Sequence, residues 1–101
     1  MKLTIDTSKQ EETTVTLLSN NKQVATLTEK KVNTQLVLPL IERIIAEQNI
    51  KLSDITEIEV HSGPGSFTGL RVGIAVATTL GKLLKIPVNG QLDADITPKY
   101  N

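Results

Sequence analysis

The residues best placed to do chemistry lie in one glycine-rich run, Gly63-Pro64-Gly65-Ser66-Phe67-Thr68-Gly69. A glycine-rich turn that opens a helix can hold a phosphate, because the free amide groups of a helix start attract anions. Ser66 or Thr68 can cap such a helix. The alternative is that the glycines only permit a sharp turn from strand to helix. The loop by itself favours this second interpretation.

Three nucleotide or nucleophile motifs fail on their spacing. A P-loop needs a glycine, then any four residues, then Gly-Lys-Ser/Thr. In this chain Gly69 is followed by Leu70-Arg71 instead of Lys-Ser/Thr. A nucleophile elbow needs a glycine two residues to either side of its serine, but Pro64 and Thr68 occupy those positions around Ser66. A dinucleotide fingerprint needs a different glycine spacing and an early parallel βαβ unit. The sequence therefore predicts no phosphoryl or acyl transfer at this loop.

His61 and Asp6 are the other candidates for chemistry. His61 is the only histidine and cysteine is absent, so a metal site built from histidines is excluded, and no cluster of carboxylates favours an oxygen-ligated one. A Ser66–His61 pair is conceivable, although no motif supplies an orienting carboxylate. Asp6 could hold a metal-bound water, but Asp6-Thr7-Ser8 more commonly caps a turn. We expect neither catalytic residues nor a cofactor.

Composition limits the partners. Eleven basic and eleven acidic residues cancel, so the chain lacks the positive charge of a nucleic-acid or anionic-membrane binder. Phe67 and Tyr100 are the only aromatic residues, which leaves almost no platform for stacking bases. No apolar run approaches the roughly 20 residues of a membrane span, and the first residues lack a signal-peptide pattern. We expect a soluble, cytoplasmic domain.

The secondary structure is predicted from periodicity. Alternating or β-branched segments predict four strands, at residues 2–6, 13–18, 23–28 and about 57–61, of which the first three form an antiparallel meander. The turn at 19–22 contains two asparagines, which tolerate a left-handed backbone. Helices are expected at about 34–48 and 68–84, and a short fifth strand at 86–88. The order is β-β-β-α-β-α-β.

The two helices raise different questions. In the first helix, one apolar face is formed by Val37, Leu40, Ile41, Ile44 and Ile45. Leu36 widens this face and Leu38 lies off it. Pro39 conflicts with a helix that starts before residue 35.

In the second helix, small residues recur every four positions, at Gly69, Gly73, Ala77 and Gly81. Three glycines cost a helix about 3 kcal/mol relative to alanine. We expect the close approach of another backbone to offset this cost. That backbone belongs either to the chain's own fold or to a partner's helix.

Three stretches together resemble the bacterial TsaB (YeaZ) family over about residues 1–90. They are Leu3-Thr4-Ile5-Asp6-Thr7-Ser8, Gln35-Leu36-Val37-Leu38-Pro39, and the run from Gly63 to Gly73 that continues the loop with Leu70-Arg71-Val72-Gly73. The resemblance implies the actin/sugar-kinase/Hsp70-like ATPase (ribonuclease H-like) fold, whose repeating half is a β-β-β-α-β-α-β unit. It also implies a role in forming threonylcarbamoyladenosine (t6A) at position 37 of tRNAs.

In that family TsaB is a non-catalytic partner of the catalytic subunit TsaD, and a TsaE-like ATPase joins them. The resemblance implies that the helices at 34–48 and 68–84 bind TsaD, and that the same surface forms a homodimer when the protein is alone. The expected interface residues are Leu36, Leu40, Arg43, Arg71, Gly73, Ala75, Ala77, Thr78, Gly81 and Lys82, with Asp6, Thr7 and Ser8 as turn or cap residues.

Two departures from the family pattern are visible. Family members usually carry a second half of similar size, so we expect residues 1–90 to form the N-terminal subdomain, residues 91–101 a flexible tail, and the usual second subdomain to be absent. A histidine that often precedes the first helix is replaced by Val32-Asn33-Thr34-Gln35. The alternative function is a small nucleotide-binding ATPase or a peptidase-like enzyme that is completed by dimerisation. Direct tRNA binding conflicts with the zero net charge.

Overall fold

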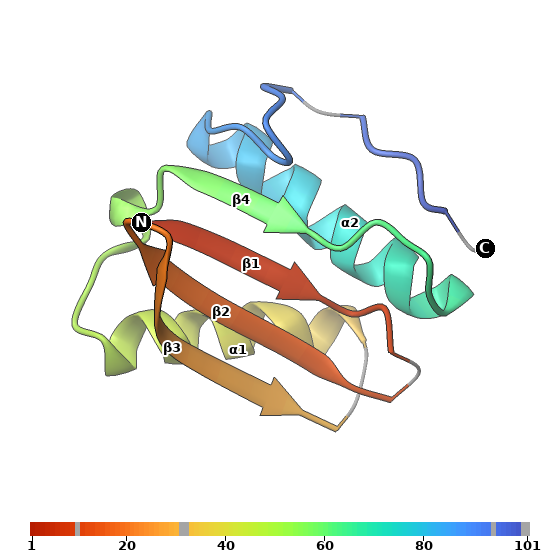
Figure 1. Cartoon of the computed structure of the whole chain (residues 1–101), viewed down its shortest axis with the longest axis horizontal. Helices are drawn as coiled ribbons and strands as arrows, with labels where there is room; N and C mark the ends of the chain where they lie inside the picture. Colours follow the sequence, from red (N-terminus) through yellow and green to blue (C-terminus); the bar gives the residue numbers. More distant parts are fainter. Residues whose placement is uncertain (10, 31–32, 94, 100–101) are drawn as a thin grey trace.

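The computed structural model describes residues 1–9, 11–30, 33–93 and 95–99, without the side chain of Thr34. One sheet runs in the order β3-β2-β1-β4 (Figure 1). Its strands are β1 (Lys2–Asp6), β2 (Thr13–Ser19), β3 (Lys22–Glu29) and β4 (Glu57–Val60). The first three strands pair antiparallel, as predicted, and β4 pairs parallel to β1. The predicted strand boundaries are correct to within one residue.

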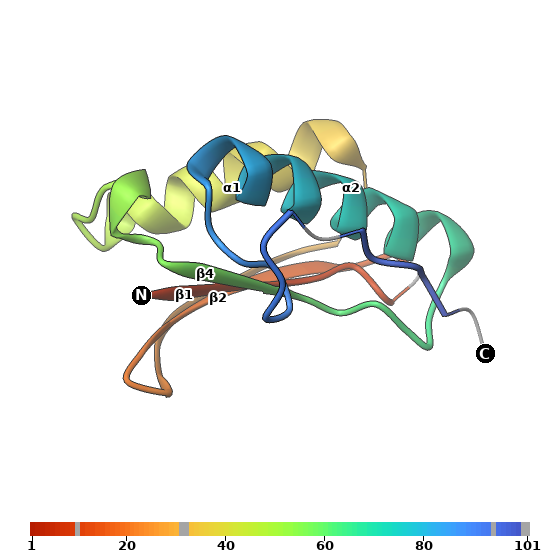
Figure 2. The same ribbon diagram turned by 90° about the horizontal axis from the view of Figure 1, so that it is seen from above.

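Two helices cover one face of this sheet. Helices α1 (Thr34–Glu47) and α2 (Phe67–Leu84) lie side by side above it, while a short 3-10 turn, η1 (Leu52–Asp54), precedes β4 (Figure 2). Alternate strand residues point toward the helices and are buried, which is the pattern expected of a sheet with one covered face. Among the described residues, the buried hydrophobic side chains are aliphatic and include Leu3, Ile5, Val15, Leu17, Ile44, Ile58 and Ala77.

The hairpin between β2 and β3 shows how local sequence sets the register. Asn20 and Asn21 adopt φ values of 54° and 63°, as a two-residue turn of this kind requires. The pairs Leu18–Gln23 and Leu17–Ala25 leave Val24 without a partner across the strand. This bulge turns Val24 outward, where its side chain is 46% exposed. A bulge in an edge strand also hinders pairing with other chains.

Helix α1 begins at Thr34 and continues through Pro39, so the predicted conflict is real. Pro39 has no amide hydrogen, and the carbonyl of Gln35 therefore lacks its helical donor. Both residues are exposed, which allows water to supply the missing hydrogen bond. Asn33 occupies the capping position of α1, but its side chain makes no capping hydrogen bond.

The predicted fifth strand at 86–88 is reduced to a single bridge between Val88 and Ile58. It stops there because Val88 and Gln91 exchange backbone hydrogen bonds of 2.9 and 3.0 Å in a turn. The side chain of Asn89 replaces the missing strand. Its Oδ1 accepts from Val60 N at 2.8 Å, and its Nδ2 donates to Val60 O at 3.0 Å.

Replacing Asn89 with alanine should therefore destabilise the fold by about 1–2 kcal/mol, because the part-buried Val60 amide loses its acceptor. Asn89 also has a φ of 49°, a left-handed backbone conformation that alanine rarely adopts. The matched control is Asn21→Ala, since Asn21 has a φ of 63° and is exposed. Urea unfolding should show a clearly larger loss for Asn89→Ala than for Asn21→Ala. Equal losses would mean that backbone conformation alone explains the effect.

The last described residues lie against the domain rather than apart from it. Lys99 N donates to Ser62 O at 2.7 Å. Ile96 packs against the core, and Pro98 lies beside Arg71, Ile74 and Ala75. Of the predicted tail at 91–101, residues 94, 100 and 101 lie outside the described part of the chain.

Helix α2 is long and apolar enough to cross a membrane by length and composition. Eight of its 18 residues are nevertheless buried inside the fold, and the core helix of a globular domain has the same properties.

Candidate functional site

The two sequence motifs, Asp6-Thr7-Ser8 and the glycine-rich loop, pack directly on each other. Ser66 N donates to Ser8 O at 2.8 Å, and the buried hydroxyl of Thr7 donates to Gly69 O at 2.5 Å. These contacts join residues 58 and 62 positions apart in the chain. The loop therefore fixes the start of α2 against the end of β1.

Glycine is needed where this contact is closest. A Cβ atom on Gly69 would lie 2.0 Å from the carbonyl oxygen of Thr7, and one on Gly73 would lie 2.2 Å from Thr7 Oγ1. Neither distance is possible for real atoms. Part of the small-residue stripe is thus explained by the chain's own fold, which was the first of the two alternatives.

Ser66 caps α2, as predicted. Its Oγ accepts from Gly69 N at 2.9 Å, and its carbonyl oxygen accepts from Leu70 N at 3.0 Å. His61 does not pair with Ser66 in this structure, because its Nε2 lies 3.2 Å from Pro64 O. The arrangement lacks the base-to-nucleophile hydrogen bond that activates a serine.

Asp6 acts as a turn cap. Its Oδ1 accepts from Ser8 N at 2.9 Å and from Ser8 Oγ at 2.6 Å. Partial burial works against the charged form, but the hydrogen bonds from Ser8 and the nearby His61 and Lys9 outweigh it, so the pKa of Asp6 is below its ordinary value. A polar cleft of about 520 Å³ opens beside it, lined also by His61 and Asn89.

The lowered pKa of Asp6 gives a pH-dependent prediction. Stability from this carboxylate is present above the unfolded pKa of about 4 and is lost as the pH falls through the lower folded pKa. Ser8→Ala should cost about 1 kcal/mol at pH 7 and much less once the pH is low enough to protonate Asp6 in the folded chain. Urea midpoints at both pH values measure this. A cost independent of pH would show that Ser8 does not act through the Asp6 charge.

The cleft offers little for a metal ion. Among the described residues, no group of three or more histidine, cysteine, aspartate or glutamate side chains could hold one.

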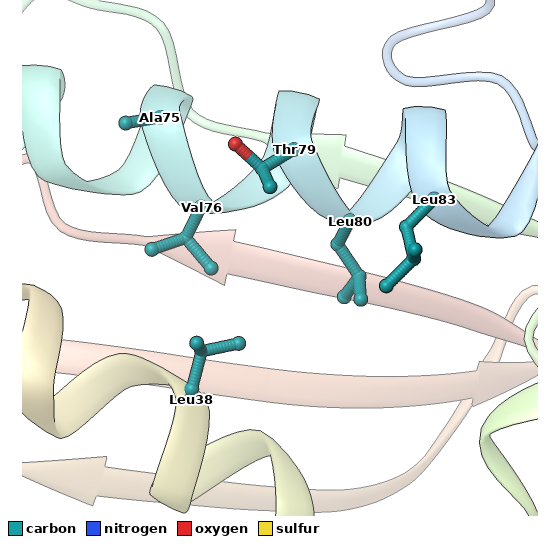
Figure 3. A pocket seen from close by; sticks show the side chains of 6 residues that line it. All are labelled: Leu38, Ala75, Val76, Thr79, Leu80 and Leu83. Carbon is teal, nitrogen blue, oxygen red and sulfur yellow. The ribbon is translucent and has the colours of Figure 1, made fainter.

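A second feature lies on the outer side of the helices. An apolar groove of about 270 Å³ runs between α1 and α2, lined by Leu38, Ala75, Val76, Thr79, Leu80 and Leu83. Figure 3 shows Leu38 of α1 pointing toward α2, with Val76, Leu80 and Leu83 directed toward the space between the helices. A neighbouring apolar hollow of about 540 Å³ shares Leu38, Leu80 and Leu83 and extends past Ile45 to Leu52.

The groove holds unusually exposed leucines. The side chain of Leu83 is 73% exposed and that of Leu38 is 46% exposed. Exposed apolar surface of this kind, next to charged residues, is typical of a protein-binding site. The sequence did contain the signal, because Leu38 lies off the apolar face of its helix, but periodicity alone did not give it a role. Of the residues that line the groove, only Ala75 was among the expected interface residues; Leu38, Val76, Thr79, Leu80 and Leu83 were not.

Four of the expected interface residues do not lie on the surface of the chain. Leu40, Gly73, Ala77 and Gly81 are buried within the chain. Gly73 faces Thr7, and a Cβ on Gly81 would lie 2.4 Å from Val88. These residues point toward the sheet or the core and cannot contact a partner on the outer surface. Leu36, Arg43, Arg71, Ala75, Thr78 and Lys82 are exposed or partly exposed.

Comparison with known proteins gives consistent similarities. The family described as "TsaD: tRNA N6-adenosine threonylcarbamoyltransferase" matches residues 24–90. The chain is 39% identical over 61 residues to the tRNA threonylcarbamoyladenosine biosynthesis protein TsaB of Buchnera aphidicola subsp. Schizaphis graminum, covering 60% of this chain and 29% of that protein. It is 31% identical over 86 residues to TsaB of Haemophilus influenzae, covering 85% of this chain and 36% of that protein.

The fold has the same relatives. YeaZ from Pseudomonas aeruginosa superposes with a TM-score of 0.78 at 32% identity, covering 86% of this chain and 41% of that one. The chain spans about a third of the length of the two TsaB proteins from Buchnera aphidicola and Haemophilus influenzae. The residues matched by the family model, 24–90, include both helices, β4 and the glycine-rich loop.

Proposed function

Because this chain belongs to the TsaD family and, within it, to the TsaB/YeaZ proteins, we propose that it is a non-catalytic partner subunit in t6A biosynthesis. It binds a TsaD-like catalytic subunit in the cytoplasm. Residues 1–90 are the binding unit. A TsaE-like ATPase is a further partner of the complex, and the chain forms a homodimer when alone.

The observation that carries this proposal is the exposed apolar groove between α1 and α2. Two adjacent helices with outward-facing leucines can pack against helices of another protein. A stable interface needs more than about 1,000 Å² of buried surface, and α1 and α2, with 14 and 18 residues, are large enough to supply one side of it.

The site near the loop supports a binding role over catalysis. Ser66 and Asp6 are engaged in capping hydrogen bonds, and the glycines are accounted for by packing. The experiment is to purify the chain together with a TsaD-like protein from the same source and to assay tRNA modification with and without the chain. The proposal requires a complex and a modification activity that depends on the chain.

The second candidate is a nucleotide-dependent enzyme that is completed by dimerisation. The observation in its favour is the polar cleft beside Asp6 and His61, since ligands of open α/β sheets bind at the carboxyl ends of parallel strands. Calorimetry with ATP and Mg²⁺ separates the two candidates. Tight binding by the chain alone would favour the enzyme, whereas the partner-subunit proposal expects no heat of binding.

A further inference from the structure

Two cations stand on one flank of α2. Arg71 and Lys82 are exposed, and α2 contains no acidic residue. They are eleven residues apart, which corresponds to about three helical turns and about 16 Å along the axis. At about 100° per residue both side chains therefore point to nearly the same side of the helix.

These charges have no counterion in the described part of the chain, where neither residue forms an ion pair. The contrast with α1 is clear. Arg43 of α1 lies 3.4 Å from a carboxylate oxygen of Glu29 and 3.1 Å from one of Glu47. Arg71 instead lies over the Phe67 ring, 5.3 Å from its centroid. This contact restrains the guanidinium before any partner arrives.

The cations and the groove lie along the same helix. Ala75 and Thr79 form the outward ridge of α2, with the leucine-lined groove on one side of it. Helical geometry places Arg71 and Lys82 on the other side of this ridge. An element that lies along the ridge of Ala75 and Thr79 with apolar side chains in the groove would run beside both cations.

We propose that the partner element docking on α2 is an amphipathic helix with two acidic side chains about three turns apart that pair with Arg71 and Lys82. Its apolar side chains fill the groove beside Leu38 and Leu83. This inference rests on the proposed function and adds the chemistry of the partner's surface to it.

Charge and polarity favour this occupant over two others. A nucleic acid has no apolar side chains for the groove, and the chain has zero net charge where phosphate binding needs many cations. A second copy of the chain that packed α2 against α2 would bring four cations together, so we expect the homodimer to be weaker than the complex with an acidic partner helix.

The test is the affinity of the full chain for the purified TsaD-like protein at 50 and 500 mM NaCl. Arg71→Glu and Lys82→Glu should each weaken binding about tenfold at 50 mM, because attraction becomes repulsion. The effect should shrink to less than about threefold at 500 mM, where charges are screened. Arg71→Gln should lie between wild type and Arg71→Glu. Lys22→Glu is the matched control, since it makes the same charge change on β3 and should leave affinity unchanged.

The outcomes separate the two claims. If the folded wild-type chain forms no complex, the proposed function fails and this inference fails with it. If wild type binds and the double variant Arg71→Glu/Lys82→Glu keeps both its affinity and its salt dependence, only the acidic partner surface is wrong. A double variant that keeps partner affinity but loses binding to tRNA would assign the two cations to nucleic acid instead.

Discussion

We expect Gly69→Ala to destabilise the domain by about 3 kcal/mol, although alanine is the better helix former by about 1 kcal/mol. The reason is the 2.0 Å separation between the added Cβ and the carbonyl oxygen of Thr7. Because the obstacle is backbone, either β1 or α2 must move. Overpacking of this kind costs about 1–3 kcal/mol or more.

Thermal unfolding followed by circular dichroism measures this effect. For a domain of this size, each kcal/mol corresponds to a shift of about 4–8 °C in Tm, so Gly69→Ala should lower Tm by roughly 12–24 °C. The matched control is Ala75→Met, which adds bulk to the exposed side of the same helix and should change stability by less than about 0.5 kcal/mol. A Gly69→Ala variant as stable as wild type would contradict the close packing of the loop on Thr7.

Gly73 provides an internal check of the same contact. The obstacle to a Cβ on Gly73 is the hydroxyl of Thr7 at 2.2 Å, while the Thr7 Cβ lies at 3.4 Å. Thr7→Ala removes the hydroxyl and makes room. The double variant Thr7→Ala/Gly73→Ala should therefore be more stable than the sum of the two single losses predicts. Additive losses would show that the two residues do not meet.

Leu83→Asp should reduce affinity for the TsaD-like protein by at least 30-fold, or about 2 kcal/mol, as expected for a central apolar contact. Leu83 lines the groove with its side chain 73% exposed, so its replacement removes no core contact. The fold should remain stable because an exposed position tolerates a charge.

Leu92→Asp is the control for this substitution. The Leu92 side chain is 63% exposed and does not line either hollow between the helices. The same apolar-to-acidic change at this position should leave affinity within about twofold of wild type. Isothermal calorimetry would measure both variants, and a comparable loss from both would mean that the groove is not the binding surface.

Local patterns predicted the secondary structure well because each strand has one buried face. In β1, Leu3 and Ile5 alternate with polar residues for this reason. The length of the fifth strand was overestimated, because the turn that ends it depends on hydrogen bonds between Val88 and Gln91. No periodicity encodes that turn.

The site was harder to predict because its contacts are long-range. The stripe of glycines indicated close packing, but the identity of the neighbour, Thr7, depends on the parallel pairing of β1 with β4. The same limit explains why four of the expected interface residues are buried in the structure. Leu40 and Ala77 look equivalent to exposed apolar residues in sequence, and only the position of the sheet shows that they face inward.

The most direct test of the partner-subunit proposal is sedimentation velocity of the purified chain mixed with a TsaD-like protein from the same source. We expect a defined heterocomplex that Leu83→Asp abolishes and Leu92→Asp leaves intact. A folded wild-type chain that sediments separately from the TsaD-like protein at micromolar concentrations would contradict it.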